Sequence, residues 1–93
     1  MHSLTSRRYG AVNWIGGIGV RPESSCLLRT AAEARSLPGA VTRSVFLGDC
    51  VQVLVHLTSG EDVVAQLPYH AANFQPGENV HFTWNAADEM TLP

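Results

Sequence analysis

The sequence predicts an all-β fold, a small antiparallel barrel, from three observations. First, residues 49–58 alternate between two faces, and one face is purely aliphatic, with Val51, Val53, Val55 and Leu57. Second, this segment is bounded by the turn-forming pairs Gly48-Asp49 and Ser59-Gly60. Third, short apolar runs recur between turn signals along the chain, which is typical of a small barrel or sandwich, and closure into a barrel protects strand edges best.

Before the alternating segment, we expect two short strands and a connection. The strands cover residues 11–15 and 18–21, with a turn at Gly16-Gly17 between them and Pro22 at the end of the second. Residues 24–36 are rich in Ala, Leu, Glu and Arg. This composition favours a connection with one or two helical turns.

The rest of the chain is predicted to be strands joined by turns and one loop. The strands are expected at residues 40–47, 49–58, 61–67 and 79–85, followed by a short last strand with Met90 and Leu92. Residues 68–77 carry two prolines and form the loop, whose Tyr69 and Phe74 are expected to fill the core. In segment 79–85, Phe82 and Trp84 are expected on the core side.

Composition restricts the function. The chain has 93 residues, a net charge of −2 and 45% hydrophobic residues, as expected for one small globular domain and not for a non-specific nucleic-acid binder. All six positively charged residues are arginines, so lysine-dependent phosphate loops and Schiff bases are excluded. We expect Cys26 and Cys50 to be free thiols in a cytoplasmic protein.

No residue pattern indicates catalysis, a cofactor or a metal. The histidines are not spaced as zinc ligands; they are His2, His56, His70 and His81. The carboxylate pairs Glu61-Asp62 and Asp88-Glu89 are sequence neighbours, and neighbours on a strand point to opposite faces. We therefore expect a protein that is not an enzyme, with no catalytic, cofactor or metal site.

Several short motifs occur in an order that resembles the TOBE domain, the transport-associated domain with an OB-like barrel. They are Val20-Arg21-Pro22-Glu23, Leu37-Pro38-Gly39, Val45-Phe46-Leu47-Gly48-Asp49, Gln75-Pro76-Gly77-Glu78-Asn79-Val80 and the strand ending at Trp84. The likeness covers residues 18–93. Residues 1–17 do not match and are expected to be an extension, with one short strand at most.

The resemblance implies an OB-like barrel of about five to six short antiparallel strands. Its implied role is that of a non-catalytic accessory and regulatory domain of the ATP-binding subunit of an ABC importer, of the spermidine/putrescine group. The implied partners are the ABC ATPase domain, a second copy in a homodimer and, indirectly, the membrane permease, without nucleic acid or membrane insertion. The location would be cytoplasmic, peripheral to the inner membrane.

Three residues are candidates for the subunit contact. Arg21 and Glu23 flank Pro22 and would share one face of an extended chain, where Arg21 could bind a carboxylate or phosphate. Asp49 would lie at the barrel mouth. The simpler interpretation is two solvated surface charges and a turn aspartate that bonds to nearby backbone amides.

Two other functions remain open. A small oxyanion sensor would need converging hydroxyl and guanidinium groups, for which Thr42, Arg43 and Ser44 are the candidates. A nucleic-acid-binding barrel would stack bases on Phe46, Phe82 and Trp84, although the lysine-free composition argues against it.

Overall fold

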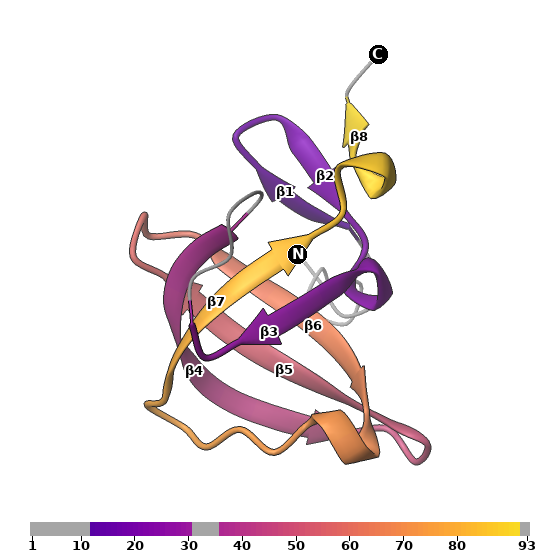
Figure 1. Cartoon of the computed structure of the whole chain (residues 1–93), viewed down its shortest axis with the longest axis vertical. Helices are drawn as coiled ribbons and strands as arrows, with labels where there is room; N and C mark the ends of the chain where they lie inside the picture. Colours follow the sequence, from indigo (N-terminus) through magenta and orange to yellow (C-terminus); the bar gives the residue numbers. More distant parts are fainter. Residues whose placement is uncertain (1–11, 31–35, 92–93) are drawn as a thin grey trace, which may run out of the picture.

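The computed structural model describes residues 12–30 and 36–91 (Figure 1). Within them, two antiparallel sheets have the strand orders β1-β2-β8 and β3-β7-β4-β5-β6. The strands are β1 (Asn13–Ile15), β2 (Ile18–Val20), β3 (Ser25–Leu28), β4 (Ser36–Phe46), β5 (Cys50–Leu57), β6 (Asp62–Pro68), β7 (Asn79–Trp84) and β8 (Met90–Thr91). Three short 3-10 helices connect them: η1 (Pro22–Ser24), η2 (Tyr69–Ala71) and η3 (Ala86–Asp88). The prediction of an all-β fold is confirmed.

The larger sheet is curled by β4, its longest strand. The first part of β4 pairs with β7 and the second part with β5, and Gly39 and Ala40 belong to both ladders. A Cβ atom on Gly39 would lie 2.7 Å from the backbone oxygen of His56, so only glycine lets the two strands approach here. A register shift between Val41 and Arg43 bends the strand further. Together these features roll the sheet around its core.

The core lies inside the curled sheet, and β5 supplies its centre. The aliphatic face predicted for β5 is buried, as are most of the large side chains that β4, β6 and β7 direct inward. This cluster includes Val41, Val51, Val53, Val55, Leu57, Val63, Ala65, Val80 and Phe82. Phe74 is also buried, as predicted, and Trp84 packs against the cluster from the side. The period-2 pattern therefore assigned the strand faces correctly.

Strand β6 ends the larger sheet, and the side chain of Asn13 occupies its open edge. The Asn13 amide nitrogen donates to the Val64 carbonyl oxygen at 2.8 Å, and the Val64 N–H donates to Asn13 Oδ1 at 2.9 Å. Asn13 is buried in β1, so this double hydrogen bond joins the smaller sheet to the barrel. β3 and η1 also lie against β6 and complete the closure.

Residues 25–28 form β3 and not the helical connection we predicted. Ser25 and Leu27 are buried, whereas Cys26 and Leu28 are exposed, and the whole strand pairs with β7. Pairing with a neighbouring strand has thus overridden a local preference for helix. Residues 31–35 of the predicted connection lie outside the described residues.

Two other predictions were wrong, and one extends beyond the described chain. Tyr69 is 53% exposed because it opens η2 at the surface and does not enter the core. The chain around Pro22 is not extended, because Pro22–Ser24 form η1. The predicted last strand is seen as β8 with Met90, while Leu92 lies outside the described residues.

Replacing Asn13 with alanine should destabilise the barrel by about 2 kcal/mol or more, because it leaves the N–H and C=O of Val64 buried without their partner. Chemical denaturation of the wild type and Asn13→Ala measures the difference. Asn79→Ala is the control, since Asn79 is an exposed strand residue. Equal losses for the two variants would contradict the role assigned to Asn13.

Candidate functional site

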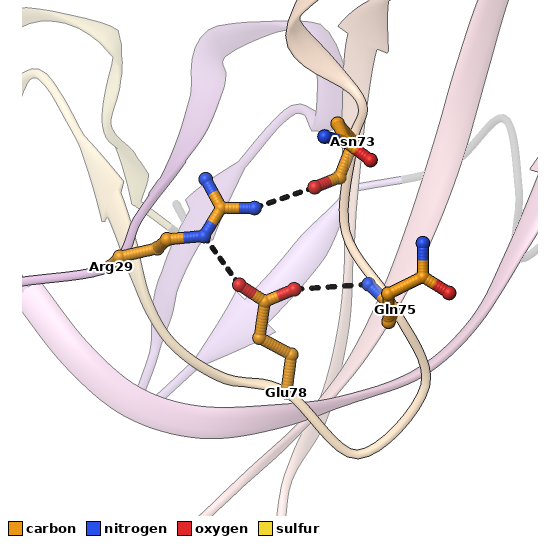
Figure 2. Close-up of polar contacts among 4 residues, drawn as sticks. All are labelled: Arg29, Asn73, Gln75 and Glu78. Atoms are coloured by element: carbon orange, nitrogen blue, oxygen red, sulfur yellow. Dashed lines mark hydrogen bonds and ion pairs between the residues drawn. The ribbon is translucent and has the colours of Figure 1, made fainter.

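A polar cluster ties the end of β3 to the loop of residues 72–78, which runs from η2 to β7 (Figure 2). Arg29, just after β3, donates from Nε to Oε2 of Glu78 and from Nη2 to the backbone oxygen of Asn73 at 2.5 Å. Its guanidinium also lies 4.4 Å from the centre of the Phe74 ring, in a cation–π contact. One arginine thus holds the loop at three points.

Glu78 holds the same loop from within. Its Oε1 accepts a hydrogen bond from the Gln75 backbone N–H at 3.0 Å, while Oε2 accepts from Arg29. The hydrogen bond from the Gln75 amide, followed by the one from Arg29, keeps the pKa of Glu78 below its ordinary value. The carboxylate is therefore ionised at neutral pH and holds both donors.

A groove of about 440 Å³ lies between β4 and the 72–78 loop, and we call it the β4–loop groove. Its lining residues are Arg43, Ser44, Phe46, Ala72, Asn73, Phe74, Gln75 and Pro76. Two of the three candidate oxyanion contacts, Arg43 and Ser44, are therefore among its lining residues, although neighbours on a strand direct their side chains to opposite faces. Thr42 does not line the groove, and its hydroxyl donates to the Leu54 carbonyl oxygen at 3.0 Å.

An exposed aromatic pair stands beside this groove. The rings of Phe46 and Tyr69 stack with their centres 6.0 Å apart and their planes at 25°. Phe46 is 66% exposed, and its neighbour Leu47 is also exposed. A stacked pair of aromatic rings in solvent is typical of a binding surface, because such residues dominate interface energetics. We had interpreted Tyr69 as a core residue and Phe46 as a base-stacking candidate.

The candidate subunit contacts lie on separate elements. Arg21 and Glu23 are exposed at η1, where the Arg21 carbonyl accepts from the Ser24 N–H at 2.9 Å. Asp49 is exposed at the tip of the β4–β5 hairpin, beside Gly48 with its positive φ of 97°. In the described part of the chain, no ion pair joins the η1 charges to Asp49. Their part in a subunit contact stays a prediction.

The cysteines and histidines of the described part show no ligand arrangement. Cys26 and Cys50 are free thiols, and partial burial followed by the charge of Asp49 raises the pKa of Cys50. Exposed His56 pairs with Asp62 across β5 and β6, with Nδ1 and Oδ1 2.8 Å apart. Within residues 12–30 and 36–91, no three His, Cys, Asp or Glu side chains gather as metal ligands. In the same ranges, no helix has the length and apolarity of a membrane span.

The order of elements and this geometry agree with a known family. The family model described as TOBE domain matches residues 18–92. The chain belongs to the TOBE domain family. A search of curated proteins finds no match for this TOBE domain.

The same fold occurs in a solved structure. The cytoplasmic molybdate-binding protein ModG, in a crystal form with molybdate bound, matches this TOBE domain with a TM-score of 0.71 at 16% sequence identity. The match covers 82% of this chain and 60% of the ModG chain, so the TOBE domain spans less than two thirds of that protein. At this identity, the likeness establishes the OB-like fold and not a shared ligand.

Sequence patterns offer little indication of the polar cluster in this TOBE domain. Glu78 was part of a motif quoted for the family resemblance, but Arg29 lay in a segment predicted to be a connection. The two residues are 49 positions apart, so no local spacing links them. The one signal for it in the sequence is that Arg29 directly follows the segment Ser-Cys-Leu-Leu, whose alternation is compatible with a strand.

Acid should loosen the 72–78 loop through Glu78. Because the folded-state pKa of Glu78 is lowered, its contribution to stability is present above the unfolded-state pKa and is lost as pH falls through the folded-state value. Melting temperatures measured from about pH 6 to pH 3 should fall less steeply for Glu78→Gln than for the wild type. Glu23→Gln, at an exposed position in η1, is the charge-matched control. A wild-type slope in Glu78→Gln would refute the assignment.

Proposed function

We propose that this TOBE domain is a non-catalytic accessory domain of the ATP-binding subunit of an ABC importer. In this role it contacts the ATPase domain and a second copy of itself, and acts indirectly on the membrane permease from the cytoplasmic side. The observation that carries the proposal is the family match over residues 18–92. The resemblance carried by the sequence motifs implies this role.

Two features of the chain support a role in contact. The exposed stack of Phe46 and Tyr69 and the exposed Leu47 offer apolar area at one end of the barrel. Because the sequence contains no lysine, it cannot supply the lysine that binds the phosphates in a P-loop, and ATP hydrolysis would belong to a neighbouring domain. Energy conversion and contact are thus divided between two units.

Sedimentation velocity tests the proposed contacts. The purified domain should form a dimer at high micromolar concentration and a larger complex when an importer ATP-binding domain from the same genome is added. Phe46→Ala should weaken the complex about tenfold, because a truncated aromatic anchor typically costs more than 1 kcal/mol. Trp14→Ala is the control, since Trp14 is exposed on the smaller sheet. A monomer that ignores the ATP-binding domain would contradict the proposal.

Oxyanion binding is the second candidate, and one observation favours it. Arg43 and Ser44 are both among the residues that line the β4–loop groove, and a guanidinium and a hydroxyl are donors of the kind that an oxyanion requires. The ModG structure, which has the same fold, has molybdate bound. In this chain such a ligand would be a regulatory signal.

Titration calorimetry with molybdate, sulfate and phosphate tests the second candidate. Arg43→Ala should weaken binding about tenfold, since a hydrogen bond to a charged group is worth roughly 1.5–3 kcal/mol. Arg21→Ala removes the same charge at η1, outside the groove lining, so the affinity should stay unchanged if the anion binds in the groove and fall if it binds at η1 instead. The absence of heat for all three anions would reject an oxyanion site.

A further inference from the structure

The second half of β4 has one edge that no strand covers. The Leu47 N–H donates to the Cys50 carbonyl oxygen at 2.9 Å, so this pair at the hairpin is hydrogen-bonded. Hydrogen-bonded and non-hydrogen-bonded pairs alternate along an antiparallel ladder. Val45, opposite Gln52, therefore directs its backbone groups toward β5, whereas Ser44 and Phe46 direct theirs away from it.

The side of β4 away from β5 loses its neighbour after Val41. The ladder with β7 ends at Ala40, and Val41 then bonds to the loop, with its N–H 2.9 Å from the Glu78 oxygen and its oxygen 2.7 Å from the Gly77 nitrogen. Beyond this point, in the described part of the chain, no backbone hydrogen bond reaches Ser44 or Phe46 from the open side. The β4–loop groove lies along this stretch.

The far wall of the groove is fixed and does not collapse onto the strand. Arg29 and Glu78 hold the loop through the contacts with Asn73 and Gln75 (Figure 2). Phe74 of the same loop is buried in the core and anchors the loop there. The gap beside β4 is therefore built into the fold.

We propose that the open edge of β4 binds an extended polypeptide segment of a partner protein as an added strand. The N–H and C=O groups of Ser44 and Phe46 are two residues apart, which is the repeat at which an extended chain presents its own hydrogen-bonding groups. The inference deepens the proposed contact role and rests on it for the source of the segment. The groove itself is a property of this chain alone.

The walls of the groove select a single strand as the occupant. A volume of about 440 Å³ lies within the range of ligand clefts, roughly 300–1,000 Å³, and the 72–78 loop forms the wall opposite β4, which favours one extended segment over a whole sheet edge. Phe46, Phe74, Ala72 and Pro76 offer apolar contacts, and Arg43 is the one ionisable residue of the lining. The complementary segment therefore carries an apolar side chain next to Phe46.

Peptide selection followed by amide hydrogen exchange tests the proposal. A phage-displayed library of random heptapeptides is selected on the intact chain, and the enriched sequences are synthesised and added to the ¹⁵N-labelled protein. We expect sequences with alternating apolar residues. They should slow exchange at the Ser44 and Phe46 amides at least about tenfold. The Val45 amide, which already faces β5, is the internal control.

A pair of variants at one position separates backbone pairing from side-chain contact. Ser44→Pro removes the backbone N–H that faces the open edge, a position where a strand tolerates proline. The variant should bind the selected peptide about tenfold more weakly. Ser44→Ala keeps the N–H and removes the hydroxyl, and should bind as the wild type does. If Ser44→Pro fails to fold, the exchange measurement on the unaltered chain still decides.

Three outcomes would overturn the inference. These are that the library enriches no peptide, that the enriched peptides protect residues elsewhere, or that Ser44 and Phe46 become protected with rising protein concentration alone, which would make a second copy the occupant. Failure of the proposed function is distinguishable, because a chain that ignores an importer ATP-binding domain can still bind a peptide at this edge.

Discussion

The closure of the barrel depends on the side-chain carboxamide of Asn13. The larger sheet ends at β6, where the backbone groups of Val64 would otherwise face away from any strand, and Asn13 supplies one donor and one acceptor in the place of a peptide group. An uncovered edge invites pairing with other chains, so this contact both closes the fold and protects it. Asn13 precedes the part matched by the family model, which begins at residue 18. The barrel thus uses a residue that lies outside the matched range.

The two ends of the barrel differ in structure. In Figure 1 the smaller sheet lies at one end of the barrel, and η2 and the loop before β7 lie at the other. At this second end, β4 leaves β7 and stays paired with β5 alone. The open edge, the groove and the stacked aromatic rings all follow from that divergence. The curvature set at Gly39 is therefore connected to the surface that is available for partners.

The sequence pattern correctly predicted strands whose two faces differ in residue type. β5 has an aliphatic face and a mixed face, and its placement was correct. β3 was missed because four residues give too short an alternation to outweigh a helical composition. Tyr69 was misplaced because aromatic residues occur both in cores and at binding surfaces, and only the position of η2 decides between them.

By itself, the sequence determined the strand faces, the turns at Gly48 and Gly60 and the lack of any lysine-based chemistry, because each of these depends on residues that are close in the chain or on composition. The tertiary structure decided how the barrel closes and where it is open. Asn13 and Val64 are 51 positions apart, and Arg29 and Glu78 are 49 apart. No local pattern relates such residues, because the curl of the sheet alone brings them into contact.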